Sequence, residues 1–235
     1  MSRLGIISGT ITLHGIVDNP EDVRINTHFG PAQVFLTDRV AFIPRHGTGT
    51  SGHILPHLVN HGANLSALKS LGVEEVIAVN STGSLKMALK PGMLVVPDDF
   101  IMLSPGPTVV QDKPVHVTPG LDSLVRERWL AAARDCNMDI RDGGVYWQTA
   151  GPRFETKAEI RFMAPFADLV GMTMASEAIV AKELDLAYAS LCSIDNYANG
   201  LVSEPLNIDE IVRCSRLNAV AVVKIIMRYL ERRML

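Results

Sequence analysis

The stretch that decides the fold is LPHLVNHGANLSALKSLGVEEVIAVNSTGS, residues 55–84, where a helical pattern passes directly into a strand. Apolar residues recur at helical spacing over 55–71. Gly72 follows, and its missing side chain permits the left-handed conformation that ends many helices. The apolar run 76–80 comes next and is typical of a buried strand. A helix followed at once by a buried strand indicates an α/β protein.

The same alternation extends along the chain. We expect an α/β fold with one central, mostly parallel, twisted sheet and helices on both faces. We expect residues 1–235 to form a single domain, because this length suits one sizeable core and no repeat or linker interrupts it. The predicted strands are 4–7, 40–44, 76–80, 94–97, 169–171 and 187–194.

Helix starts and one long connection can also be predicted. Thr156 with Glu159, and Asn207 with Glu210, both fit the reciprocal capping arrangement at a helix start. The proline-rich segment 104–119 has little periodicity, and we expect an ordered surface excursion there.

The composition limits the classes of partner. A formal charge of −3 gives no electrostatic reason to bind nucleic acid. No apolar run reaches the ~20 residues that span a bilayer, and the N-terminus lacks the pattern of a signal peptide. Cys136, Cys192 and Cys214 lack metal-ligand spacing and suit a reducing compartment. We therefore expect a cytoplasmic protein that binds neither nucleic acid nor membrane and holds no metal.

Small polar residues and one cation follow several predicted strands. Because the carboxyl ends of parallel strands meet at one edge of a sheet, these residues can surround one anion. The loop 5–10 offers glycines and a hydroxyl, although a plain turn has the same composition. Arg45 and His46 offer a cation and a donor for phosphate, with a surface ion pair as the alternative. Ser81 adds a hydroxyl, and Thr173 begins a helical run whose amino end can face the same crevice.

Three further residues suit a flat heterocycle. Phe154 can stack on a planar base and Glu155 can accept two adjacent N–H bonds; a core aromatic and a carboxylate at a helix dipole are the alternative. The amide of Asn196 can accept and donate at once, which matches a base edge with one N–H and one carbonyl, unless Asn196 is only a turn residue.

The segment GTGTSG, residues 47–52, matches the glycine fingerprint of dinucleotide-binding folds. That fingerprint needs an acidic residue at the end of the next strand, but Glu74 and Glu75 precede the strand 76–80. A nicotinamide-dependent oxidoreductase is therefore the least favoured interpretation.

Seven segments, taken in order, resemble the trimeric purine nucleoside phosphorylase and methylthioadenosine phosphorylase family, and the likeness covers nearly the whole chain. They are GIISGT at 5–10, RHG at 45–47, PHLVNHGANLSALK from 56, NSTGSL from 80, GPRFETKAE from 151, GMTMASEAIVAKEL from 171 and YASLCSIDNYANG from 188.

The resemblance implies a pentosyltransferase that moves the ribose of a purine nucleoside to inorganic phosphate through a ribosyl cation-like transition state, with no cofactor. Asn196 would stabilise the leaving base, while Arg45, His46 and Thr173 position phosphate. A homotrimer, or a hexamer built as a dimer of trimers, is also implied, with His116 entering a neighbour's site; a solvated loop histidine is the alternative. The implied sites are phosphate on Thr10, Arg45, His46, Ser81 and Thr173, ribose along Met172, and the base on Phe154, Glu155 and Asn196.

The substrate can be narrowed by chemistry. Relatives that act on 6-aminopurines typically carry aspartate where this chain has Asn196 and Ala198. Asn196 can accept from N7–H and donate to O6, and Glu155 can accept the N1–H that neutral adenine lacks. Ile208 stands where enzymes that prefer a free 5′-hydroxyl usually have histidine. We therefore expect phosphorolysis of 6-oxopurine nucleosides, with 5′-methylthioinosine favoured over inosine or guanosine.

Several positions depart from the family pattern. Ser8 and Ile11 replace usual glycines, and a short insertion after His46 leaves His53 out of register with a phosphate-contacting histidine of the family. Three alternatives follow: a 5′-methylthioadenosine phosphorylase, a hydrolytic nucleosidase, and a catalytically weak nucleoside-binding protein.

Overall fold

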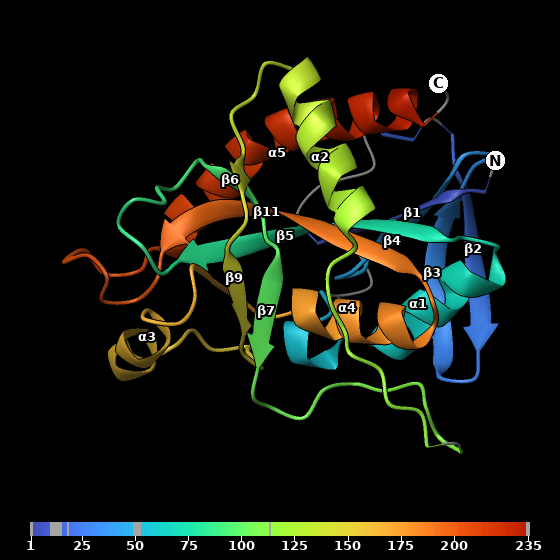
Figure 1. Cartoon of the computed structure of the whole chain (residues 1–235), viewed down its shortest axis with the longest axis horizontal. Helices are drawn as coiled ribbons and strands as arrows, with labels where there is room; N and C mark the ends of the chain where they lie inside the picture. The colour runs from blue at the N-terminus through green and yellow to red at the C-terminus, as the bar shows by residue number, and fades with distance from the viewer. Residues whose placement is uncertain (1, 10–15, 18, 49–52, 113, 234–235) are drawn as a thin grey trace.

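The computed structural model describes residues 2–9, 16–17, 19–48, 53–112 and 114–233. An 11-stranded sheet forms the centre of this part of the chain (Figure 1). The strands are β1 (Leu4–Ser8), β2 (Glu21–Thr27), β3 (Gly30–Leu36), β4 (Val40–Pro44), β5 (Glu75–Ser84), β6 (Leu94–Val96), β7 (Asp99–Met102), β8 (Arg141–Asp142), β9 (Val145–Gln148), β10 (Leu169–Gly171) and β11 (Ala187–Tyr197).

The sheet is mixed, and its centre is parallel. β1 lies between β4 and β5 and runs parallel to both, and β11 is parallel to β5 over nearly its whole length. Antiparallel pairs add the β2–β3 hairpin beside β4, and β6 beside β11. β10 also runs antiparallel to β5, although the sequence predicts a mostly parallel sheet. The six predicted strands all form, and β5 and β11 are longer than predicted.

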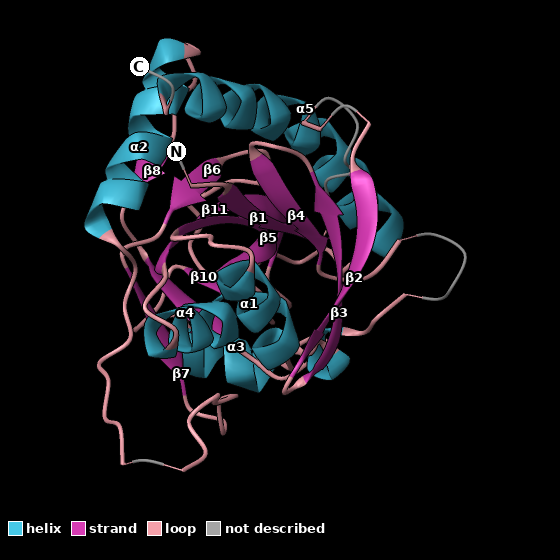
Figure 2. Cartoon of the chain, turned by 90° about the vertical axis from the view of Figure 1, so that its right-hand side faces the viewer, coloured by secondary structure: helices cyan, strands magenta, loops and turns pink. Residues whose placement is uncertain are grey.

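Helices cover both faces of the sheet, as predicted (Figures 1 and 2). α2 (Ser123–Asp135) and α5 (Ile208–Arg232) lie on one face, and α1 (His61–Ser70) and α4 (Met174–Glu183) on the other. Because side chains alternate along a strand, β5 feeds both cores. Ile77 packs in the cluster that contains Trp129 and Tyr229 from the first pair of helices. Ala78 packs in the opposite cluster, which includes Leu68 of α1.

The helix predicted over 55–71 is divided. A short 3₁₀ helix, η2 (Pro56–Leu58), comes first, and α1 begins only after Asn60. The side chain of Asn60 accepts the Ala63 N–H at 2.9 Å, which satisfies a first-turn amide and sets the helix start. At the other end Gly72 has φ +75°, the left-handed conformation expected there.

The predicted caps are found, one of them in part. Thr156 and Glu159 form the complete reciprocal box at the start of α3 (Lys157–Met163). Asn207 caps α5 by accepting the amides of Asp209 and Glu210, but these described residues show no return bond from Glu210.

The connection 104–119 carries neither helix nor strand in its described residues. Glu183 at the end of α4 accepts the Thr108 hydroxyl at 2.9 Å and the Val109 amide at 2.7 Å, and so anchors the connection to the helix. Among the helices of the described ranges, none combines the length and apolar character needed to cross a membrane.

Candidate active site

A cavity of about 380 Å³ lies at the carboxyl edge of the central strands. It brings together nine predicted site residues, which come from segments far apart in the chain. β10 reaches it differently from the parallel strands: it runs antiparallel to β5, so it approaches from the opposite side. The predicted residues that line the cavity are Arg45, His46, Ser81, Phe154, Glu155, Met172, Thr173, Asn196 and Ile208.

Two predicted site residues are not placed in this cavity. Thr10 lies outside the described residues. His116 is exposed on the 104–119 connection, and it does not line the cavity of its own chain.

Arg45 follows β4 and is buried, with 2% of its surface exposed. Its Nε and Nη2 donate to the two carboxylate oxygens of Glu177 at 2.5 and 3.0 Å, and Nη1 donates to the Val79 carbonyl at 2.9 Å. Burial alone would lower the pKa of Arg45, but the Glu177 carboxylate outweighs burial and raises it. The alternative of a surface ion pair is therefore wrong: the pair is buried, and its two unused N–H groups remain for a ligand.

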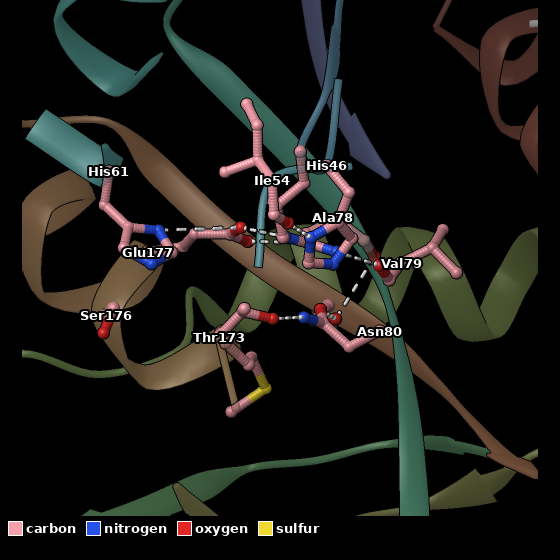
Figure 3. A network of polar contacts seen from close by, with 12 residues as sticks. His46, Ile54, His61, Ala78, Val79, Asn80, Thr173, Ser176 and Glu177 are labelled. Atoms are coloured by element: carbon pink, nitrogen blue, oxygen red, sulfur yellow. Dashed lines mark hydrogen bonds and ion pairs between the residues drawn. The ribbon is translucent and has the colours of Figure 1, made fainter. Parts of the chain in front are cut away.

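His46 is neutral and half-buried. Its Nδ1 lies 2.7 Å from the Ile54 carbonyl oxygen, and its ring stacks on His53 with centroids 4.8 Å apart (Figure 3). Burial, followed by the neighbouring Arg45, lowers the pKa of His46 to about 4. The sequence predicts a donor here, but the Nδ1 hydrogen is already used inside the protein. His53, displaced in sequence by the insertion, still lines the cavity.

Thr173 presents a hydroxyl whose polarity is set by its neighbours. Its Oγ1 accepts from Asn80 Nδ2 at 2.8 Å (Figure 3). The Asn80 Oδ1 in turn accepts the Ser190 hydroxyl at 2.6 Å. All three side chains are buried. Since the Thr173 oxygen is an acceptor toward Asn80, its hydrogen is free to donate into the cavity.

The amino end of α4 is less available than the sequence predicts. The Tyr146 hydroxyl oxygen accepts the amides of Thr173 and Met174 at 3.2 and 3.4 Å. Gln148 Oε1 accepts the Ser176 amide at 3.1 Å. Both acceptors come from β9. They satisfy first-turn amides that an anion would otherwise use, so the Thr173 side chain is the main donor from this helix.

Phe154 and Glu155 lie at the opposite part of the cavity. Phe154 is 38% exposed rather than packed in the core. Glu155 is buried, and its Oε1 accepts the Thr149 hydroxyl at 2.7 Å. Its Oε2 has no hydrogen-bond partner among the described residues, which leaves one carboxylate oxygen for a ligand.

Asn196 belongs to β11 rather than to a turn, at a register shift between Ile194 and Asn196. Its Nδ2 donates to the Tyr197 carbonyl at 2.8 Å. This bond orients the amide, so that Oδ1 and the second N–H remain for a ligand.

A buried carboxylate stands behind Ser81. Asp195 accepts the Ser81 hydroxyl in a short hydrogen bond, and it accepts from Asn218 Nδ2 of α5 at 2.8 Å. Burial raises the pKa of Asp195. These contacts connect β5, β11 and α5 beside the cavity.

The third part of the cavity is apolar. Ile208 and Ile211, from the first turn of α5, line it together with Leu206 and Leu55. A small apolar substituent suits this wall better than a hydroxyl, because the wall side chains offer no hydrogen bond.

A larger cavity of about 530 Å³ lies at the amino ends of β5 and β11. Its charged groups are paired with one another: Glu75 accepts from Arg128 and from the Tyr229 hydroxyl, and it lies 3.3 Å from Arg233. This pairing explains the cluster as part of the fold.

Sequence reasoning missed the residues that hold the site from behind, chiefly Glu177, Tyr146 and Asp195. Glu177 lies on a helix 132 positions from Arg45. No local pattern announces such a pair. A buried acidic residue in the apolar run 174–181 was the available signal.

The match to known proteins agrees with this geometry. Residues 4–231 match the model of a family described as the phosphorylase superfamily. The chain belongs to the phosphorylase superfamily. A fellow protein of Archaeoglobus fulgidus, named a probable 6-oxopurine nucleoside phosphorylase, is 43% identical over 229 residues, which cover 95% of this chain and 93% of that protein.

Two further superfamily proteins extend the comparison. A protein of Methanocaldococcus jannaschii, named a probable S-methyl-5′-thioinosine phosphorylase, is 40% identical over 89% of this chain and 84% of its own length. The structure of methylthioadenosine phosphorylase from Schistosoma mansoni with adenine has a TM-score of 0.85 and 26% identity, and covers 98% of this chain and 91% of that chain.

Proposed function

We propose that this member of the phosphorylase superfamily is a pentosyltransferase that cleaves 6-oxopurine nucleosides with inorganic phosphate. The products are the free purine and a ribose 1-phosphate. One observation carries the proposal: a single cavity holds the Arg45 and Thr173 donors at one end and Phe154, Glu155 and Asn196 at the other. The names of similar proteins from Archaeoglobus fulgidus and Methanocaldococcus jannaschii support it.

The base end of the cavity fits a 6-oxopurine. The free Oε2 of Glu155 accepts N1–H, and Phe154 stacks on the ring. Asn196 accepts from N7–H through Oδ1 and donates its second N–H to O6, because its first N–H is held by Tyr197. This interaction stabilises the departing base. Adenine lacks N1–H and carries an amino group at C6, so it leaves polar groups unpaired, and discrimination of roughly 10⁴-fold is attainable.

Phosphate binds at the other end through Arg45, His46, Ser81 and Thr173, and we extend the site to Thr10 by resemblance. Met172 lies along the ribose. The apolar wall that contains Ile208 receives a 5′-methylthio group, which makes 5′-methylthioinosine the preferred substrate over inosine or guanosine.

The assembly belongs to the same proposal. We propose a homotrimer in the cytoplasm in which the exposed His116 of one subunit completes the ribose site of the next. No cofactor is required, since phosphate is the co-substrate and the transferred group is a ribosyl cation equivalent.

The test is to incubate the protein with 5′-methylthioinosine, inosine, guanosine and 5′-methylthioadenosine, with and without phosphate, and to separate the products by chromatography. We expect phosphate-dependent release of hypoxanthine, fastest from 5′-methylthioinosine. The same mixtures with Ile208→His should favour inosine more than wild type does. Cleavage that is independent of phosphate would identify a hydrolase, and faster cleavage of 5′-methylthioadenosine would refute the 6-oxopurine assignment.

A further inference from the structure

Two nitrogen atoms of opposite polarity lie side by side at the anion end of the cavity. A Cβ placed on Gly9 would be 2.8 Å from His46 Nε2 and 3.1 Å from Arg45 Nη1. All three residues line the cavity. Because Gly9 has no side chain, a small ligand can reach both nitrogens at once.

The tautomer of His46 follows from its contact with Ile54. The Ile54 carbonyl oxygen lies 2.7 Å from Nδ1, and a carbonyl can only accept, so Nδ1 carries the hydrogen. The Ile54 amide donates to the His46 carbonyl at 3.0 Å, and the stacked His53 ring restrains the imidazole plane. In the neutral ring Nε2 therefore presents a lone pair.

The charged form of His46 is disfavoured by its surroundings. Burial and the adjacent Arg45 guanidinium lower the pKa of His46 to about 4. Arg45 itself stays charged because it is paired with Glu177. At neutral pH the anion end therefore has donors from Arg45 and Thr173 and an acceptor at Nε2 of His46.

We propose that His46 is a specificity-determining residue whose Nε2 accepts the proton of monohydrogen phosphate. The cavity thereby selects a tetrahedral dianion that carries one proton over a fully deprotonated one such as sulfate. Arg45 and Thr173 donate to the unprotonated oxygens, while the P–OH donates to His46. Sulfate has the same shape and charge but places an oxygen lone pair against Nε2. The inference rests on the proposed function, because it requires phosphate at this end of the cavity.

The first test uses the wild-type protein. Dissociation constants for phosphate, arsenate, sulfate and fluorophosphate are measured by titration calorimetry at pH 8, where phosphate and arsenate are dianions with one proton. A hydrogen bond to a charged group corresponds to roughly a 10- to 100-fold difference in affinity. We expect phosphate and arsenate to bind at least about 10-fold more tightly than sulfate and fluorophosphate.

A second test assigns the selectivity to one atom. His46→Asn keeps an amide N–H for the Ile54 carbonyl but removes the acceptor at Nε2. We expect phosphate binding to weaken roughly 10-fold with little change for sulfate. His57→Asn is the matched control, because His57 is exposed and does not line the cavity; its anion selectivity should equal that of wild type.

The outcomes separate this inference from the proposed function. If wild-type protein cleaves nucleosides only with phosphate but binds sulfate as tightly as phosphate, the proposed function stands and the role of His46 is refuted. Equal weakening of phosphate and sulfate in His46→Asn would also refute it. Absence of any phosphate-dependent cleavage would instead overturn the proposed function.

Discussion

Replacing Glu177 by Gln tests whether Arg45 depends on its buried carboxylate. The two side chains are 2% and 1% exposed, and they share two hydrogen bonds. The Tyr188 hydroxyl donates a third bond to Glu177 Oε2 at 2.7 Å. A glutamine amide keeps one acceptor oxygen, so its NH₂ group must face at least one of these donors. The substitution thus leaves the Arg45 charge buried without its counter-charge.

The magnitude follows from this burial. Breaking a buried ion pair by removing one partner costs about 3–5 kcal/mol, because the remaining charge is uncompensated. For a chain of this size, each kcal/mol lowers the melting temperature by about 2–4 °C. We therefore expect Glu177→Gln to melt roughly 6–20 °C below wild type, and to bind phosphate more weakly because Arg45 is no longer held in place.

The assay is thermal unfolding followed by circular dichroism, with calorimetric titration of phosphate on the folded variant. Glu159→Gln is the matched control: Glu159 also pairs with Arg153 through two bonds, both at 2.8 Å, but that pair is exposed to solvent. Glutamine at this position preserves the capping box, so the control should melt close to wild type. A melting temperature of Glu177→Gln within 2 °C or so of the control would refute the reasoning.

Three further changes have defined outcomes. Asn196→Asp should shift kcat/KM toward 6-aminopurine nucleosides by roughly 10²-fold or more, and an unchanged ratio of inosine to adenosine cleavage would contradict the assigned role. Gly9→Ala places a Cβ 2.5 Å from His46 Cδ2, so the KM for phosphate should rise roughly 10- to 100-fold in initial-rate assays, while base binding is retained. Burial lowers the pKa of His61 to about 4 from 6.5, so the unfolded state binds more protons between these values. The free energy of unfolding should therefore fall by about 3 kcal/mol as pH drops from 6.5 to 4, and urea titrations of His61→Asn should lose part of this slope.

The central strands are the part of the fold that the sequence predicts well. A parallel strand buried on both faces reads as a continuous apolar run, so 40–44 and 169–171 coincide with the strands that form. β2 was missed because it is half-exposed, and its sequence EDVRINT resembles a polar loop as much as a strand. The antiparallel direction of β10 has no signal in its three residues.

The composition of the cavity was predictable, but the directions of its hydrogen bonds were not. Residue types at strand ends indicate which side chains gather, and Arg45, Thr173 and Asn196 do line one cavity. Whether a group donates or accepts depends on partners that are distant in the chain, such as Ile54 for His46 and Asn80 for Thr173. The prediction of His46 as a donor failed for this reason.

The charge balance of the cavity bears on how the proposed reaction proceeds. Arg45 and Glu155 are the Lys, Arg, Asp or Glu side chains that line the described part of the cavity, and Arg45 is already paired with Glu177. A phosphate dianion bound there keeps much of its negative charge. Because the ribose becomes cation-like in the transition state, that remaining charge stabilises it more than the neutral substrate. A site with several unpaired cations would hold phosphate more tightly but would weaken this attraction, so pairing Arg45 with Glu177 favours catalysis over affinity.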